Sequence, residues 1–312
     1  MISNLLGLLF RSIVVLSGTA IVTFALLWNA PGDPAQAIAM ARFDALLTED
    51  VIDQVRREVG LDASFWSAFG DWIGPLLVFD FGHSAVTGRP VWPDLWTSIT
   101  YTFPLALVSL AIGLAVSIPL AILATKRPGG LLDRFAVAIA SLGTAIPAFW
   151  LGLLLILLFS VQLAWLPAMG ARTPAHAVLP ALTLGLGTAA SLTRIIRSGI
   201  LEARGQPFLP AIRRRGVTSK AMDRDHIAPH AAIPVVTVIG LELAFLLEGL
   251  VVVEVIFGRP GLGTFLTSAI VARDFPHVQA VVVVTALVFV TVNLLIDVIY
   301  QLIDPRIGER DA

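Results

Sequence analysis

Three glutamates lie within an otherwise apolar run of the sequence. Glu242, Glu248 and Glu254 are six residues apart between Pro234 and Phe257. An ionised group inside a membrane span is costly, and such groups usually face a bundle interior or water. Six residues correspond to about 600° of α-helix, so successive carboxylates are rotated by about 120°. The three therefore cannot share one face, and each is a candidate for lining a polar path.

Two interpretations of Glu248 remain open. As a path residue, its carboxylate would meet water or a passing cation. As a structural residue, it would form an ion pair with a partner subunit. Either arrangement would compensate for burying the charge. Asp297, after the last apolar run, is more typical of a helix-end or inter-subunit hydrogen-bonding group.

Two histidines have the spacing of metal ligands. His226 and His230 are four residues apart, which would place both on one face of a helix. Pro229 disturbs that helix, and no third ligand is close in sequence. We therefore predict no metal site here and expect these rings to cap the backbone or form hydrogen bonds.

The sequence lacks several motifs of nucleotide and hydrolytic chemistry. It contains no G-x-x-x-x-G-K-[ST] phosphate loop, no H-E-x-x-H and no G-x-S-x-G. It has no cysteine, which excludes disulfides, thiolate metal sites and cysteine nucleophiles. We therefore expect a protein that is not an enzyme and has no cofactor of its own.

The composition predicts a polytopic membrane protein, because 57% of the 312 residues are hydrophobic and only 14% are charged. A helix crossing the bilayer needs about 20 mostly apolar residues. Six stretches qualify: 12–28, 99–125, 135–163, 177–192, 234–257 and 278–296. The first is too long for a signal-peptide core, and PGDPA follows it in place of a cleavage site. The predicted fold is all-α, with six transmembrane helices.

Lysine and arginine are distributed unevenly among the loops. With the N-terminus inside, fourteen of the 21 fall on the cytoplasmic side. The other seven are in the outer loops, and the first outer loop alone contains ten acidic residues. The positive-inside rule therefore predicts that both termini are cytoplasmic.

These assignments divide the chain into three parts. Residues 1–30 form the first transmembrane helix, 31–98 an extracytoplasmic loop, and 99–312 a five-helix core. In the outer loop, Thr48 followed by acidic residues predicts a short helix that ends at Gly60. The aromatic run after it is typical of interfacial packing.

A basic connector at 198–233 interrupts the apolar runs on the cytoplasmic side. Phe208, Leu209 and Ile212 would share one side of a short helix, with three arginines in its last turn. We expect the helix to begin at Pro210, because a proline is tolerated in the first turn, and to end at Gly216. Thr218 would cap a second helix. A short amphipathic helix of this kind could act as a lever, that is, as a docking element to which another protein binds.

Several motifs resemble the permease subunits of binding-protein-dependent ABC importers, in the dipeptide, oligopeptide and nickel branch. They follow the family's order along nearly the whole chain: PGDPA (31–35), LPAMG (166–170), Gly216, HIAPHAAIPVVTVIG (226–240), VVVEVIFGRPGLG (251–263), ARDFPHVQ (272–279) and DPRIGER (304–310). The resemblance implies a type I importer fold with a cytoplasmic coupling helix.

In that family the coupling helix docks on a separate ATPase. The resemblance assigns this contact to Phe208, Ala211, Ile212, Arg214 and Gly216. It also implies a second, homologous permease, two ATP-binding subunits that hold ATP and Mg, and an extracytoplasmic solute-binding protein. The expected location is the bacterial cytoplasmic (inner) membrane, surrounded by lipid, and no nucleic-acid partner is expected.

The cargo remains open at this point. Di- and oligopeptides are the commonest cargo of the branch, whereas LAWLPAMG (163–170) and GQPF (205–208) are similar to nickel permeases. Two other classes are less well supported. A stand-alone secondary transporter should show an internal repeat, and we find no clear one. A membrane scaffold would leave the intramembrane carboxylates unexplained.

Overall fold

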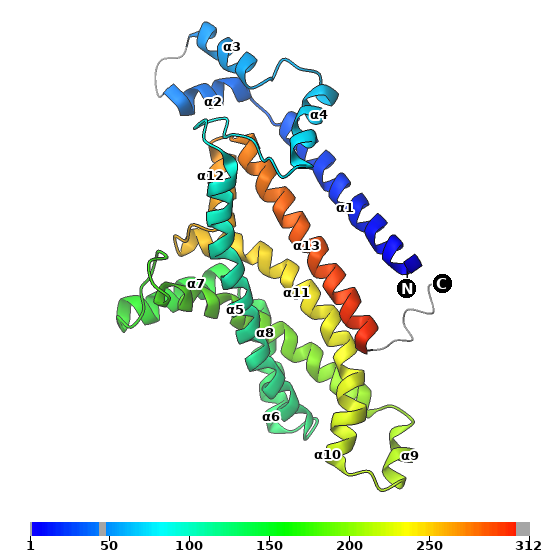
Figure 1. Ribbon diagram of the computed structural model, residues 1–312. Helices are drawn as coiled ribbons and strands as arrows, with labels where there is room; N and C mark the ends of the chain where they lie inside the picture. The colour runs from blue at the N-terminus through cyan, green and yellow to red at the C-terminus, as the bar shows by residue number, and fades with distance from the viewer. Residues whose placement is uncertain (1, 44–47, 304–312) are drawn as a thin grey trace. The chain divides into compact units, whose positions relative to one another are not determined.

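The computed structural model describes residues 2–43 and 48–303, and these form helices joined by loops (Figure 1). The elements in order are α1 Ile2–Trp28, α2 Pro34–Phe43, α3 Glu49–Glu58, α4 Phe65–Leu76, α5 Val91–Thr125, α6 Leu131–Ala145, α7 Ala148–Leu155, η1 Ile156–Gln162, α8 Ala175–Arg204, α9 Leu209–Arg214, α10 Ser219–Met222, η2 Asp223–Ile227, α11 Ala228–Ile256, α12 Leu262–Val271 and α13 Phe275–Ile303. The predicted all-α fold is confirmed.

The chain folds as two compact units. Unit 1 comprises Met1–Thr102 and Pro260–Thr291, and unit 2 comprises Phe103–Arg259 and Val292–Ala312. Unit 1 holds the short helices of the predicted outer loop together with α12. Unit 2 holds the basic connector and the three glutamates of α11.

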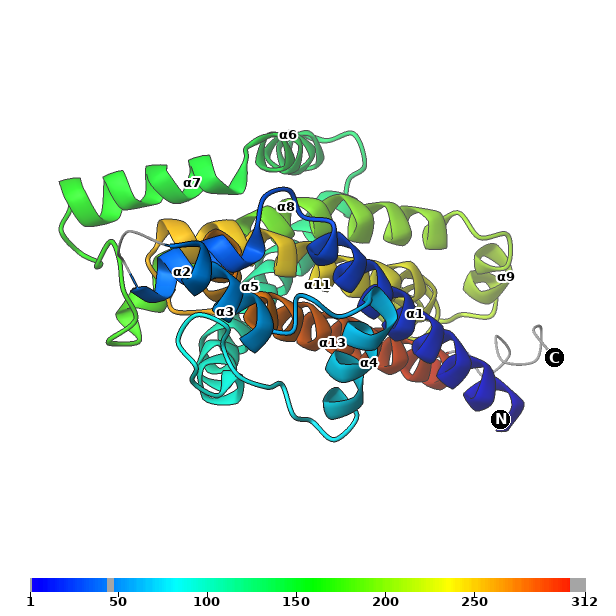
Figure 2. The same cartoon turned by 90° about the horizontal axis from the view of Figure 1, so that it is seen from above.

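Five helices in the described part of the chain are long and apolar enough to cross a membrane. A sixth candidate is the run predicted at 135–163, but it is divided into two helices bent by 100°. Figure 2 shows α6 end-on while α7 runs across the view. Ile146 is extended (φ −83°, ψ 121°) because Pro147 disfavours a helical conformation in the residue before it. The sequence did not predict this bend, and six transmembrane spans stay a prediction that depends on whether the bent pair crosses the membrane as one span.

Helix α8 lies at the centre of unit 2 and packs against α11, α6 and α7. Leu179 and Leu184 of α8 meet Leu250 and Phe257 in the apolar core. Small residues bring the helices close together. A Cβ on Gly143 of α6 would lie 2.6 Å from the Cβ of Ala190, which is too short for real atoms. Close approach through small residues is a general way for membrane helices to associate.

Buried polar contacts fix the basic end of α8. Asp133 of α6 is 3% exposed and accepts hydrogen bonds from Arg197 Nη2 at 2.8 Å and from the Gly129 amide at 2.7 Å. Arg204 donates to the carbonyl of Thr125 at the end of α5. The same guanidinium lies 3.6 Å from the Asp223 carboxylate. Three segments are therefore attached to α8 where it leaves the apolar region.

In unit 1, helix α3 lies close to its predicted position. It runs from Glu49 to Glu58, with Thr48 at the N-cap, although the Thr48 side chain makes no capping hydrogen bond. Val55 is 1% exposed and packs against Ile38 of α2. Amphipathic packing therefore holds α3 in place where the predicted cap does not.

The aromatic run forms α4 and packs against the end of α1. Phe24 stacks on Trp72, with ring centroids 5.5 Å apart, and meets Phe65 and Phe69 edge-on, each at 5.3 Å. Such aromatic pairs stabilise beyond the area that they bury. The aromatic run therefore packs within unit 1, and its predicted place at a membrane interface stays a prediction.

We predict that Arg197→Ala destabilises unit 2. The substitution leaves the Asp133 carboxylate buried without its cation. Losing one partner of a buried pair costs about 3–5 kcal/mol. We expect the lower end, because 24% of the Arg197 side chain is exposed. The thermal melting temperature of the purified protein measures the effect.

Arg224→Ala is the matched control. The ion pair of Arg224 with Asp225 is largely exposed, at 80% and 45%, so its loss should leave the melting temperature close to that of the wild type. Equal melting temperatures for the two variants would contradict the role assigned to Asp133 and Arg197.

Candidate functional site

The basic connector forms a helical lever at the end of α8 (Figure 1). Helix α9 begins at Leu209, so Pro210 lies in its first turn, within one residue of the expected start. Gly216 follows it with φ +80°, the left-handed conformation that favours glycine. Thr218 Oγ1 accepts a hydrogen bond from the Ala221 amide at 3.3 Å and caps α10 as predicted. From α10 the chain continues through η2 directly into α11.

Apolar packing attaches α9 to the rest of unit 2. Leu209 is 6% exposed and clusters with Ala203 of α8, Met222, Ile227 and Ala231. The start of α9 is therefore packed against the ends of α8 and α11.

Phe208 packs inward. Its ring lies 5.2 Å from that of His230, and His230 Nδ1 is 2.8 Å from the carbonyl oxygen of His226. The hydrogen bond expected of these histidines is present for His230. Phe208 is half-buried, so within this chain its ring helps to position α9.

The other residues assigned to the ATPase contact are more accessible. Ala211, Arg214 and Gly216 are exposed, and Ile212 is half-buried. Arg213 and Arg215 are also exposed. The structure thus presents a small apolar surface surrounded by cations, and its role as a contact remains a prediction.

The three glutamates of α11 occupy three different environments, as their rotation predicts. Glu254 is fully buried and Glu242 is 8% exposed, whereas Glu248 is exposed on the surface of unit 2. Because exposure to lipid would be costly, the face carrying Glu248 needs water or a partner against it. Asp297 does not end its helix, since α13 continues to Ile303.

Glu242 lies beside the break between α6 and α7. It hydrogen-bonds to Ser191 of α8 and lines a cavity of about 170 Å³. Gly143 and Ile146, on either side of the bend, line the same cavity. Interrupted helices are found at solute sites in transporters.

Sequence reasoning missed a buried polar cluster in unit 1. Asp274 accepts hydrogen bonds from Ser84 Oγ and from the Ala85 amide at 2.9 Å, and it lies 2.6 Å from His277 Nδ1. Burial raises the pKa of Asp274, but hydrogen bonds from His277, Ser84 and Ala85 outweigh it, so the pKa lies below its ordinary value. The carboxylate is therefore ionised at neutral pH and pins the loop at Ser84 to the start of α13.

These residue types invite comparison with a hydrolytic triad, but the geometry excludes one. In a triad the histidine accepts the serine proton and the aspartate orients the histidine. Here Ser84 and His277 both bond to Asp274. The serine hydroxyl is therefore not activated by the imidazole, and the cluster is structural. The i, i+3 spacing of Asp274 and His277 was the only local signal for it.

Motifs that are distant in the sequence contact one another within each unit. In unit 1, Arg273 Nη2 donates to the carbonyl of Pro31 at 2.7 Å, beside Gly32, whose φ is +94°. In unit 2, the Gly170 amide donates to the carbonyl of Phe257 at 2.8 Å. These motifs are therefore packing partners. The motif at 304–310 lies outside the described residues.

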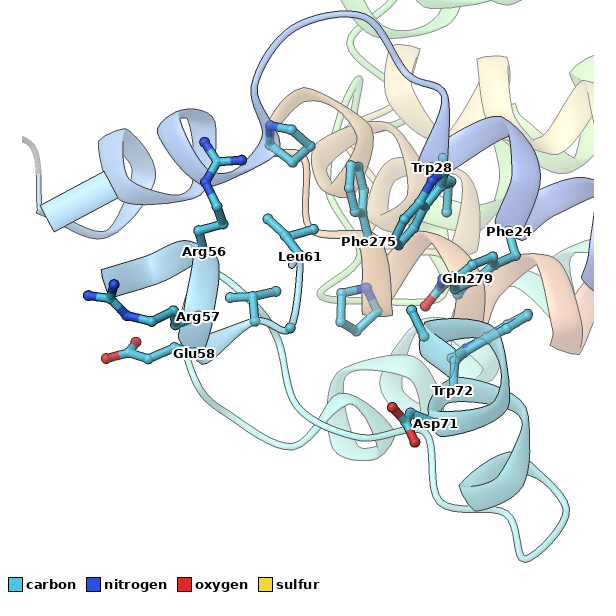
Figure 3. Close-up of a pocket in the computed structure, with 16 residues that line it drawn as sticks. Phe24, Trp28, Arg56, Arg57, Glu58, Leu61, Asp71, Trp72, Phe275 and Gln279 are labelled. Carbon is cyan, nitrogen blue, oxygen red and sulfur yellow. The ribbon is translucent and has the colours of Figure 1, made fainter. Parts of the chain in front are cut away.

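A cavity of about 480 Å³ opens within unit 1 (Figure 3). Phe24, Trp28, Trp72 and Phe275 form its aromatic side, and charged side chains of α3 stand at the other side. Arg56 is already engaged, 2.6 Å from Asp33. Arg56 and the aromatic rings of α1 and α4 therefore serve packing within unit 1 as well as lining the cavity.

Comparison with known proteins identifies close relatives. Residues 117–309 match the family described as binding-protein-dependent transport system inner membrane component. The glutathione transport system permease protein GsiC of Escherichia coli (strain K12) is 37% identical over 98% of this chain and 97% of its own length. The Salmonella typhimurium (strain LT2) protein of the same name is 38% identical over the same shares.

Solved structures show the same fold at lower identity. An amino acid ABC transporter solved with histidines matches with a TM-score of 0.54 and 19% identity, over 67% of this chain and 94% of that one. The inward-facing MetNI methionine ABC transporter matches with a TM-score of 0.57 and 20% identity, over 68% and 98%. The architecture is that of type I importer permeases.

Proposed function

The chain belongs to the binding-protein-dependent transport system inner membrane components, and on that basis we propose that it forms half of the translocation pathway of an ATP-driven importer. It is a multi-pass permease subunit of an ABC importer in the inner membrane, not an enzyme. In such systems a separate subunit hydrolyses ATP. The observation that carries the proposal is α9, a short helix with an exposed cationic side.

We assign the ATPase contact to α9 and its flanks. Ala211, Ile212 and Arg214 would lie in a cleft of the ATPase, and Gly216 would allow the chain to turn back. Buried Leu209 supports this role, because it links α9 to the ends of two long helices. Phe208 would contribute by holding α9 against His230.

The assembly that we propose contains two permease subunits and two ATP-binding subunits. ATP and Mg would be bound by the latter. A solute-binding protein would deliver cargo to the side carrying α2, α3 and α4. The exposed carboxylate of Glu248 supports a second permease, because a partner surface would remove it from lipid.

For the cargo we propose di- or oligopeptides. The glutathione permease name of the relatives supports a peptide-type cargo. A nickel chelate is the alternative from the same branch, and no specific observation favours it. Glu242 and Glu248 are the carboxylates that we assign to the path, whereas fully buried Glu254 suits a structural role better.

We predict that Ile212→Asp abolishes cargo-stimulated ATP hydrolysis and uptake. Burying an unpaired carboxylate in a docking cleft costs several kcal/mol, about 3–5 by the measure of broken buried pairs. Ile212 is only half-buried in this chain, so the permease itself should still fold. The measurement is ATP turnover and uptake by the reconstituted transporter.

Ile212→Leu is the matched control and should retain activity, because it keeps the apolar character of the side chain. Normal transport by an assembled Ile212→Asp complex would exclude α9 as the coupling contact.

Replacing Glu248 by Gln separates its two proposed roles. Gln keeps the shape and hydrogen bonding of the side chain but removes the charge. A path role predicts reduced uptake at an unchanged melting temperature. An ion pair with the partner predicts a complex that dissociates or melts earlier, since the partner charge is left alone.

Glu254→Gln is the variant with which Glu248→Gln is compared. The side chain of Glu254 is fully enclosed within unit 2, so it is not accessible to a solute in the path. Uptake and melting are measured together for both variants. Wild-type values for Glu248→Gln in both measurements would eliminate both roles.

A further inference from the structure

A cavity of about 810 Å³ lies within unit 2 at the base of the helical lever. Its apolar walls include Ile118 and Ile122 of α5, Ile196 and Ile200 of α8, and Val235 of α11. A volume of this size is in the range of small-molecule sites. No residue assigned above to the ATPase contact or to the path lines it.

The rim of this cavity is cationic. Lys126, Arg204, Lys220 and Arg224 line it, and Asp223 is the one acidic residue among the described residues of its lining. Arg204 and Arg224 already face Asp223 and Asp225. Lys126 and Lys220 are exposed, and within the described part of the chain neither forms an ion pair. Two cations from different elements are therefore available to an anion.

The apolar and the cationic residues that line this cavity lie at different positions along the helices. Ile118 and Ile122 belong to the span of α5, which ends at Thr125, and Lys126 follows at once. Val235 begins the apolar part of α11, whereas Lys220 lies upstream in α10. With these spans in a bilayer, the cavity would pass from hydrocarbon to water along its length. A lipid molecule changes from apolar to charged across the same boundary.

We propose that this cavity binds one anionic phospholipid of the cytoplasmic leaflet. An acyl chain would lie along Ile118, Ile122 and Val235, and the phosphate would lie between Lys126 and Lys220. Basic pockets between transmembrane helices on the cytoplasmic side suit such head groups. A zwitterionic head group fits less well, because its own cation would approach the same lysines.

The position of the site gives the lipid a role in coupling. The head group would join the end of α5 to α10, and α10 shares the buried cluster that anchors α9. A bound lipid would therefore stiffen the base of α9. The inference rests on the proposed orientation, with this end of unit 2 in the cytoplasm.

The first test measures lipid retention. The purified complex of permease and ATPase subunits is mixed with phosphatidylglycerol or phosphatidylcholine, and bound lipid is counted by native mass spectrometry. Removing two cations beside an anionic head group should weaken phosphatidylglycerol binding about 30-fold in Lys126→Gln/Lys220→Gln. Phosphatidylcholine binding should not change.

Arg127→Gln/Arg134→Gln is the matched control. It removes two exposed cations from the same part of unit 2, and neither lines the cavity. The control should bind phosphatidylglycerol like the wild type. Equal binding by the lysine variant and the wild type would overturn the proposal. The number of bound lipid molecules is measured without uptake or ATP turnover. Failure of this test can therefore be distinguished from failure of the proposed transport function.

A second test identifies the molecule that occupies the cavity in a chain that keeps Lys126 and Lys220. The photoreactive residue p-benzoylphenylalanine is introduced at Ile122, whose side chain is partly exposed in the cavity wall. Illumination in phosphatidylglycerol nanodiscs should attach lipid to this chain. Attachment to a second permease or to an ATPase subunit would show that protein fills the cavity and would overturn the proposal.

Discussion

The cost of placing ionised groups among apolar helices governs the arrangement of unit 2. Asp133 is nearly inaccessible and is held by Arg197 and the Gly129 amide. Glu242 is satisfied by Ser191 and lies beside the bend between α6 and α7. These groups are compensated inside the chain, whereas exposed Glu248 requires something from outside it. The cost of an unpaired charge thus explains both the hydrogen bonds inside the chain and the need for a partner at Glu248.

The C-terminal end of α8, which is held by these contacts, also supports the helical lever that contains α9. Arg204 joins α8 to the end of α5, and Leu209 buries the start of α9 between α8 and α10. A short helix of six residues would not be stable alone, because helix nucleation is unfavourable. Its stability comes from the cluster beneath it. The same packed side chains connect α9 to two long helices, α8 and α11.

The all-helical architecture could be predicted from the sequence, and so could features that depend only on neighbouring residues. Apolar runs predicted the helices, Gly216 marked the end of α9, and the six-residue spacing separated the three glutamates. The bend at Ile146 was missed because a proline in a long apolar run does not by itself distinguish a tolerated kink from a break. Leu209 was predicted to share one side of the helix with Phe208 and Ile212, but one and a half turns carry too little periodicity to show that it is buried within the chain.

Long-range contacts were beyond the sequence. Ser84 and Asp274 are 190 residues apart, and nothing in either segment specifies the other. Arg204 and the Thr125 carbonyl are separated by 79 residues. Such pairs depend on how the helices pack, which a single sequence does not encode in any local pattern. Of the two, the contact of Arg204 with Thr125 lies in unit 2, at the end of α8 from which the basic connector leaves.

The proposed ATPase contact can be tested directly because the chain contains no cysteine, so that one introduced cysteine is unique within it. Ala211→Cys places it on exposed α9, and Asp62→Cys places it on the exposed loop after α3. In the assembled transporter, a photoreactive maleimide at position 211 should cross-link to the ATPase subunit, and one at position 62 should not. A cross-link to the ATPase from position 62, or none from position 211, would contradict the account.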